Sequence, residues 1–334
     1  MPLDHPTAAL PISLDPPPVP VISGRASTQT CPSPSSEEAA EQLAGATGNL
    51  TPAVESKSTR PRNDVATGER VDVWDVPFDR LDMRESVDHI DRLIQRGEPS
   101  YVVTANLNYC MLHHQSEAVR QITAGAALIL ADGQPIVWRS RLGNRPLPTR
   151  VAGSEMIDHL CRRAAEKGWR VYFLGGQEGV AHAAAEELRR RHPKLHVAGT
   201  ESPPYRSLSP EEQIEQAARI RDARTDLLLV AFGQPKGELW IHKHYRTLGV
   251  PVSIQLGASF DFLAGTAKRA PEVYQRFGME WAYRMFSDPK RLIPRYAGNA
   301  AFLAAALWRD WKRQVTAWGL GEWDRGGQDS SGAV

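Results

Sequence analysis

Short runs of apolar residues alternate with segments of helical periodicity between about residues 72 and 268. Each run is roughly four to eight residues long, which is the length of a buried strand. We expect strands near residues 71–76, 101–104, 127–130, 169–176, 195–200, 226–232 and 252–256. Because helices separate these strands, the pattern predicts an α/β fold with a mostly parallel sheet that flanking helices cover on both faces.

The expected helices fill the segments between these strands. In the first of them, Val87, Ile90 and Ile94 recur at helical spacing. Ser154 and Gly168 are residue types that suit the N-cap and C-cap of the helix between them. The remaining helices are expected over residues 109–124, just beyond residue 132, and over residues 175–193, 210–223 and 233–249.

No further strand is expected after Lys268, and residues 269–318 have a helical pattern. Between Arg276 and Arg313 this stretch has eight basic and three acidic residues, with aromatic residues interleaved. One interpretation is an amphipathic helix at a membrane interface, with cations near anionic headgroups and indoles at the polar boundary. The other is a helix that packs on the sheet and exposes a solvated basic face. The composition alone favours neither.

The first 68 residues are rich in Pro, Ser, Thr, Ala and Gly and contain scarcely an aromatic residue. Such a segment buries too little apolar surface to offset its ordering entropy, so we expect it to be disordered. The expected layout is a disordered extension over residues 1–68, an α/β core over 69–268, a helical appendage over 269–318 and a disordered tail over 319–334.

Composition and charge narrow the functional classes. No apolar run reaches the ~18 residues of a transmembrane helix, and the proline-rich N-terminus lacks the basic region of a secretory signal. The formal net charge of +1 gives no indication of a nucleic-acid partner. Cys31, Cys110 and Cys161 form no CxxC pair, so reduced thiols of a cytosolic protein explain them best.

Polar residues lie at the ends of two neighbouring predicted strands. Thr104 and Asn106 lie at the end of one, and Asp132 follows the other. Ligands of open parallel sheets bind outside the carboxyl ends of the strands, so these are candidate site residues. Asp132 suits a general base that takes a proton from an acceptor hydroxyl. The alternatives are an N-cap role for Asp132 and ordinary turn chemistry for Thr104 and Asn106.

Two further features suit phosphate binding. Arg150 comes directly before VAGSE, where an inward position is expected, and its planar fork matches a diphosphate. Gly175 and Gly176 stand at a strand-to-helix junction, where free N–H groups favour an anion. The same glycines leave a nicotinamide oxidoreductase as an alternative, although the acidic residue expected about 20 positions later is missing.

No metal-binding or cofactor pattern accompanies these residues. The chain has no Asp-x-Asp, HExxH, Walker or GxSxG motif. The adjacent His113 and His114 cannot share one helix face, which argues against a two-histidine metal site. We therefore expect a reaction that uses neither a metal nor a cofactor.

Seven segments, taken in order, carry a resemblance to a known family. They read TANLN, ADGQPIVW, RVAGSE, FLGG, VAFGQPKGELW, GASFDFLAGTAKRAP and MEWAYRMFSDPKRLIPRY. This ordered set resembles the WecG/TagA/CpsF glycosyltransferases (glycosyltransferase family 26) over roughly residues 72–300. The resemblance implies a Rossmann-like sheet and an inverting hexosyltransferase that is independent of metal.

Members of that family transfer a hexose from a UDP-sugar to a polyprenyl-diphosphate-linked sugar during synthesis of bacterial surface polysaccharide or exopolysaccharide. The resemblance implies a UDP-sugar donor with glucose, galactose, N-acetylmannosamine or its uronic acid as the hexose. It also implies that acceptor and an anionic membrane surface as partners. The protein would be cytoplasmic and peripheral to the inner face of the plasma membrane. A homo-oligomer is allowed, and no nucleic acid is implied.

Carried onto this chain, the resemblance makes Asp132 the general base and places Thr104, Asn106 and Arg150 near the reacting groups. A second set of residues would lie near UDP, namely Gly175, Gly176, Gly233, Gln234, Lys236 and Glu238. A third set would belong to an appendage that reaches the membrane and closes over the diphosphate, namely Arg284, Arg291 and Arg295.

Three departures from the family pattern bear on the donor. Where the family commonly reads PKQE, this chain has Gly237, so a glutamine expected to help hold substrate is absent and Gln234 is the candidate substitute. Glu155 stands where Asp is common, and Arg291 and Arg295 are spaced one residue wider than expected. Gly237 also favours an alternative function, a non-catalytic protein that binds nucleotide-sugar or lipid diphosphate within a polysaccharide assembly complex.

Overall fold

The computed structural model describes residues 69–204, 206–267 and 289–323, without the side chains of residues 289–295, 314 and 317–323. These residues belong to one compact unit of the chain, Asn63–Val334. The disorder expected for residues 1–68 and the role expected for Arg284 lie outside the described residues. The expected domain boundaries stay predictions.

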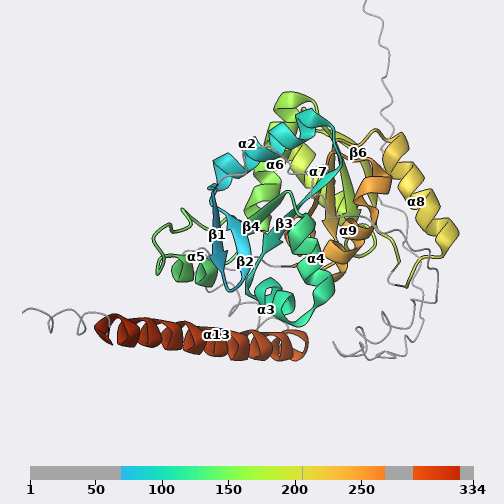
Figure 1. Cartoon of the computed structure of the whole chain (residues 1–334). Helices are drawn as coiled ribbons and strands as arrows, with labels where there is room; N and C mark the ends of the chain where they lie inside the picture. The colour runs from blue at the N-terminus through green and yellow to red at the C-terminus, as the bar shows by residue number, and fades with distance from the viewer. Residues whose placement is uncertain (1–68, 205, 268–288, 324–334) are drawn as a thin grey trace, which may run out of the picture. The chain divides into compact units, whose positions relative to one another are not determined.

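A parallel sheet lies at the centre of the fold, with helices on either side (Figure 1). It has six strands in the order β4-β3-β8-β7-β5-β6. All five neighbouring pairs are parallel. The α/β fold predicted from alternating strands and helices is therefore confirmed. The strands are β3 Ser100–Ala105, β4 Leu128–Ala131, β5 Arg170–Gly175, β6 His196–Glu201, β7 Leu227–Ala231 and β8 Val252–Gln255.

Helices cover both faces of this sheet, as the buried clusters on its two sides show. On one face lie α2 Met83–Arg96, α6 Gly153–Lys167, α7 Val180–Arg191 and α10 Ser259–Leu263. On the other face lie α3 Leu107–Gln115, α4 Glu117–Gly125, α5 Gln134–Ser140, α8 Pro210–Asp222 and α9 Lys236–Leu248.

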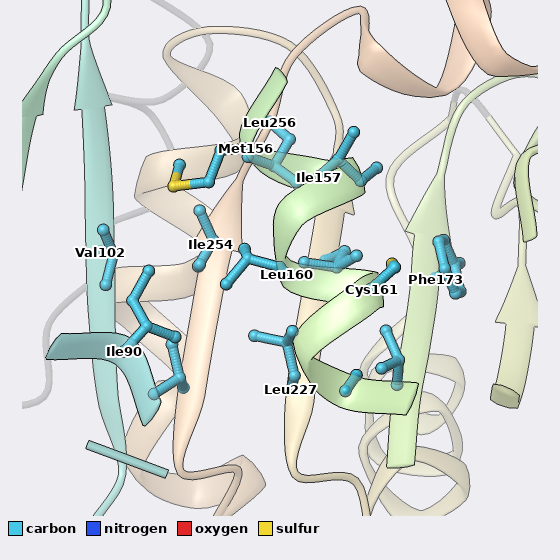
Figure 2. Close-up of a cluster of buried hydrophobic side chains, with 14 of the residues drawn as sticks. Ile90, Val102, Met156, Ile157, Leu160, Cys161, Phe173, Leu227, Ile254 and Leu256 are labelled. Carbon is cyan, nitrogen blue, oxygen red and sulfur yellow. The ribbon is translucent and has the colours of Figure 1, made fainter. Parts of the chain in front are cut away.

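The core is built from strands that are apolar on both faces. Successive strand residues point to opposite sides, so Val102 packs beneath α2 and α6 whereas Val103 packs beneath the helices of the other face. Figure 2 shows the first cluster, in which Met156, Leu160 and Cys161 of α6 lie near Val102, Ile254, Leu227 and Phe173 of the sheet. Cys110 and Cys161 are free and buried, and burial raises the pKa of both thiols.

Residues 71–76 form a hairpin and not the single strand expected from the sequence. Strands β1 Arg70–Val73 and β2 Val76–Asp79 pair antiparallel. Trp74 and Asp75 form the two-residue turn with φ values of 51° and 63°. Such turns normally carry Asn-Gly or similar residues, so the sequence contains no signal for it. Tertiary contacts hold Trp74 instead, because its ring meets Phe302 edge-on at 5.9 Å.

The single helix expected over residues 109–124 is two helices, α3 and α4. Ser116 is extended, and its hydroxyl accepts a hydrogen bond from the N–H of Val119 at the start of α4. Arg120 donates to the carbonyl oxygens of His113 and His114, which satisfies the end of α3.

The two predicted caps of α6 have different outcomes. Its N-cap is Ala152, so the prediction of Ser154 was wrong. Gly168 is the C-cap with φ of 75°, as predicted.

Helix α13, Pro289–Trp323, packs against the core through one face. Ala306 is buried there, and Asp310 is 8% exposed. Asp310 accepts hydrogen bonds from the Trp74 indole at 3.2 Å and from two nitrogens of Arg139, the longer at 2.9 Å. The helix runs past residue 318, where the appendage was expected to end. Within the part of the chain that the structure describes, no helix combines the length and apolar character needed to cross a bilayer.

The ion pair at Asp310 makes the docking of α13 sensitive to pH. Burial raises the pKa of Asp310, but the hydrogen bonds from Arg139 and Trp74 outweigh it, so the pKa lies below its ordinary value. The docking energy of this carboxylate is therefore fully present above its ordinary pKa. It is lost as the pH falls through the lowered pKa.

Replacing Asp310 with Ala should weaken the docking of α13 by about 1.5–3 kcal/mol, because Arg139 and Trp74 lose a charged hydrogen-bond acceptor. Hydrogen exchange of the backbone amides in residues 300–313 measures this loss at neutral pH. The difference from wild type should shrink below about pH 4, where the wild-type carboxylate also begins to lose its charge. Asp222→Ala, at an exposed carboxylate of α8, is the control. Equal exchange in both variants would contradict the anchoring role.

Candidate functional site

Thr104, Asn106, Asp132 and Arg150 lie together at the carboxyl ends of β3 and β4. The two strands pair in parallel up to Ala105 and Ala131, and the N–H of Asp132 donates to the carbonyl oxygen of Ala105 at 2.9 Å. The N–H of Val151, the residue after Arg150, donates to the carbonyl oxygen of Ala131 at the end of β4 at 2.8 Å. The structure thus brings four residues from three separate segments to one edge of the sheet.

Asp132 stands at the entry to α5 without capping it. The N-cap of α5 is Gly133, so the interpretation of Asp132 as the N-cap was wrong. Asp132 is half-buried, and Gly133 lies beside the backbone of Asn106 and Leu107.

Thr104 and Asn106 both make structural hydrogen bonds. The hydroxyl of Thr104, which is 8% exposed, donates to the backbone carbonyl of Gln255 at 3.1 Å. The side-chain oxygen of Asn106 accepts from the N–H of Tyr109 at 3.1 Å and caps α3. The turn chemistry considered for Asn106 is therefore present. For a ligand, Thr104 offers its oxygen as an acceptor and Asn106 its amide nitrogen as a donor.

Arg150 pairs with a carboxylate of the same edge. Its Nη2 donates to Oε1 of Glu155 at 2.8 Å, and the side chains are 17% and 38% exposed. Glu155 is in the first turn of α6. The pair holds the guanidinium next to the end of β4.

A second group of polar side chains lies where β7 leads into α9. Gln234 accepts a hydrogen bond from the amide of Asn108 at 2.9 Å and donates to Glu238 at 3.1 Å. Glu238 is 5% exposed and lies in the first turn of α9, where the positive end of the helix dipole favours a carboxylate. Burial raises the pKa of Tyr109, and the nearby charge of Glu238 acts in the same direction. Lys236 is exposed.

Gly175 and Gly176 have packing reasons for being glycine. Gly175 has φ of 120°, and a Cβ there would lie 2.7 Å from the backbone carbonyl of Ala231 in β7. Gly176 has φ of 75°, and its N–H donates to the carbonyl oxygen of Ala231 at 3.0 Å. That N–H is therefore engaged within the sheet, and the expected anion contact at this turn stays a prediction.

The strand order sets the spacing of these groups. Asp132 follows β4 and Gly175 ends β5, four strand intervals away, which is about 19 Å at roughly 4.8 Å per interval. Strand β8 lies between the two groups and ends at Gln255, which is 3% exposed.

Gln255 and the buried Asn108 are further polar residues of this edge that were not among the predicted site residues. Gln255 could have been noticed as a polar residue inside an apolar run. Asn108 could have been noticed as the last residue of TANLN.

The remaining predicted site residues belong to the C-terminal segment. Arg291 and Arg295 are part of α13, but their side chains are outside the described residues, as is all of Arg284. Their expected contact with a diphosphate stays a prediction. Among the side chains that the structure does describe, no three of the His, Cys, Asp or Glu type are arranged to hold a metal ion.

Fold and site together define a class. The chain is a parallel α/β protein whose polar side chains gather at the carboxyl ends of the strands, where enzymes of this architecture bind their ligands. A family comparison makes the assignment specific. The model of the glycosyl transferase WecG/TagA/CpsF family matches residues 71–316, and the chain belongs to this family. The match includes both polar groups and the docked part of α13.

Curated relatives cover most of the described core. The chain is 32% identical over 231 residues to an N-acetylglucosaminyldiphosphoundecaprenol N-acetyl-beta-D-mannosaminyltransferase of Bacillus spizizenii, which covers 66% of this chain and 88% of the relative. It is 31% identical over 228 residues to a protein of the same name from Staphylococcus aureus, which covers 67% of this chain and 87% of the relative. The first 68 residues lie outside the family match.

Proposed function

We propose that the protein is an inverting, metal-independent transferase that moves a hexose from a UDP-sugar to a polyprenyl-diphosphate-linked saccharide. The observation that carries the proposal is the position of Asp132. A carboxylate stands at the carboxyl edge of the sheet, next to Thr104, Asn106 and Arg150, in a chain that belongs to a glycosyltransferase family. The relatives act, by their name, on a sugar joined to undecaprenol through a diphosphate, which supports the class of acceptor.

The proposed reaction is a single in-line displacement. The carboxylate of Asp132 takes the proton from the acceptor hydroxyl, and the hydroxyl oxygen attacks the anomeric carbon of the donor. The bond from that carbon to UDP breaks on the opposite face, which inverts the configuration. Arg150, the N-terminus of α9 and the arginines Arg284, Arg291 and Arg295 stabilise the negative charge of the departing diphosphate.

The donor is proposed to bind over the second polar group. Gly233, Gln234, Lys236 and Glu238 line the turn between β7 and α9, and Gly175 and Gly176 end the neighbouring strand. The name of the relatives favours an N-acetylmannosaminyl donor, with glucose, galactose and the uronic acid of N-acetylmannosamine as the other candidates. A non-catalytic binding protein was the alternative that Gly237 favoured. Packing against Gln255 now explains this glycine, so that alternative loses its supporting observation.

We also propose that α13 holds the protein at an anionic membrane surface. Leu307, Trp311 and Val315 recur every fourth residue on one exposed face, and Trp308 stacks on Trp311 at 4.8 Å between ring centroids. Exposed basic residues flank this face, and Nζ of Lys312 lies 5.4 Å from the ring centre of Trp308. Indoles beside cations suit the headgroup region of an anionic bilayer. The docked face of α13 bears out the packing interpretation, and its exposed face supports the proposal of a membrane contact.

A UDP-release assay across the four candidate donors tests the proposed function. The full-length protein should release UDP from one of them only when a polyprenyl-diphosphate-linked sugar is present, and chelation of metal should leave the rate unchanged. A thermal-shift titration with UDP and with a nicotinamide dinucleotide serves as the binding control, because only a ligand of the folded protein raises its melting temperature. UDP binding without release from any donor would favour the non-catalytic binding protein.

A further inference from the structure

Gln255 occupies a central position between the two polar groups of the site. It is the last residue of β8, which lies between β3 of the first group and β7 of the second. Its backbone carbonyl accepts the hydrogen bond of Thr104 at 3.1 Å. One residue therefore contacts the first group through its main chain and is placed to contact the second through its side chain.

The side chain of Gln255 binds the turn that follows β7. Its amide nitrogen donates to the carbonyl oxygen of Val230 at 2.9 Å, and its amide oxygen accepts from the N–H of Gly233 at 3.0 Å. The residue is 3% exposed, so both hydrogen bonds are shielded from water. A buried amide with both ends satisfied has one well-defined position. The turn from Gly233 to Glu238 is therefore fixed to β8 at its first residue.

Gly237 is the counterpart of this glutamine. A Cβ at position 237 would overlap the amide group of Gln255. The φ of Gly237 is not in the left-handed region, so the space taken by Gln255, and not backbone conformation, requires a glycine there. The family that this chain resembles commonly has a glutamine at the position of Gly237. In this chain, a glutamine from β8 fills the same volume from the opposite direction.

We propose that Gln255 is a positioning residue for the donor, which holds the turn between β7 and α9 at a fixed distance from Thr104 and replaces the glutamine missing at position 237. The inference rests on the proposed function, because it assigns this turn to the donor. It also reassigns the substitute expected at Gln234. That side chain binds Asn108 and Glu238, whereas the Gln255 amide is the group that meets position 237.

Three variants of the full chain test the proposal: Gln255→Ala, Gly237→Gln and the double variant Gln255→Ala with Gly237→Gln. Gln255→Ala removes both hydrogen bonds to the turn and should raise the donor KM and the Kd for UDP about tenfold. The acceptor KM should stay unchanged, because Thr104 bonds the main chain of Gln255. Gly237→Gln should be at least as impaired, because its side chain displaces the buried amide.

The double variant is the decisive member of the set. If the two positions supply one amide group to one volume, the effects are strongly non-additive, and the double variant should recover most of the donor KM lost by either single variant. Backbone hydrogen exchange over residues 231–238 gives a second readout that needs no activity. The exchange should be faster in Gln255→Ala and slower again in the double variant.

The outcomes separate this proposal from the proposed function. Wild-type protein that releases no UDP from any donor contradicts the function, while hydrogen exchange still tests the positioning. The positioning proposal is overturned if Gln255→Ala leaves exchange and donor KM unchanged, or if donor and acceptor KM rise equally. It is also overturned if the effects of the two substitutions on donor KM simply add in the double variant.

Discussion

Asp132→Asn should lower the rate of sugar transfer by at least about 100-fold while UDP binds as tightly as in wild type. The amide has nearly the shape of the carboxylate but cannot take the proton of the acceptor hydroxyl. The main-chain hydrogen bond from Asp132 to Ala105 and the cap of α5 at Gly133 do not involve the carboxylate, so the edge of the sheet should keep its geometry. UDP release with saturating donor and acceptor measures the rate, and a titration with UDP measures the binding.

A matched control for this variant is Asp82→Asn. Asp82 caps α2 through its side chain, and Asn is an equally good N-cap, so the same exchange of carboxylate for amide should leave folding and transfer unchanged. Near-normal turnover by Asp132→Asn would remove Asp132 from the role of general base. A loss of UDP binding together with transfer would indicate a structural role for the carboxylate.

Replacing Trp308 and Trp311 with Ala should weaken binding to anionic phospholipid vesicles by about 30-fold. Both indoles are about half exposed, 55% and 53%. Moving that exposed part into the interface contributes roughly 1 kcal/mol for each, about half the value for a fully buried side chain. Co-sedimentation of the full-length protein with vesicles measures the partition, and neutral vesicles should bind much less of the wild-type protein.

The charges beside these indoles should act by a different mechanism. Arg309→Gln with Lys312→Gln removes two exposed cations, worth about 1 kcal/mol each near an anionic surface, and should lower the dependence of vesicle binding on salt. Ile214→Ala, which removes a 66% exposed apolar side chain from α8, is the control for both variants. If vesicle binding is the same in all of them, α13 is a packing helix with a solvated basic face.

Much of the fold follows from periodicity alone. The apolar runs located all six strands of the central sheet. Five of these strands are buried and are therefore apolar at successive positions, and the sixth, the edge strand β6, is only partly buried. The break between α3 and α4 has a local cause, the cap at Ser116, whereas the hairpin at residues 71–76 was missed because long-range contacts decided its structure. Trp74 forms a left-handed turn because Asp310 and Phe302 hold its ring, and both partners are more than 200 residues away in the chain. No local pattern contains that information.

The candidate site was predictable in part for the same reason. Parallel strands end at one edge, so polar residues after two strands identified Thr104, Asn106 and Asp132. The sequence did not predict a role for Gln255, because that role depends on its packing against Gly237, which has no side chain. Gly175 and Gly176 suggested an anion cradle, whereas their close approach to β7 is a sufficient reason for glycine. The sequence identifies residues that could bind a ligand, but only the packing shows which of them already make structural contacts.

Helix α5 has a further consequence for how the enzyme would work at a surface. It is seven residues long, or about 10 Å, and it joins the backbone beside Asp132 to the arginine that binds α13. A short, stiff rod thus runs between Asp132, the proposed general base, and the helix proposed to meet the lipid. If both proposals hold, seating α13 on a membrane and aligning Asp132 would be linked through α5. A protein detached from lipid would differ from the attached one in catalytic alignment as well as in access to its substrate.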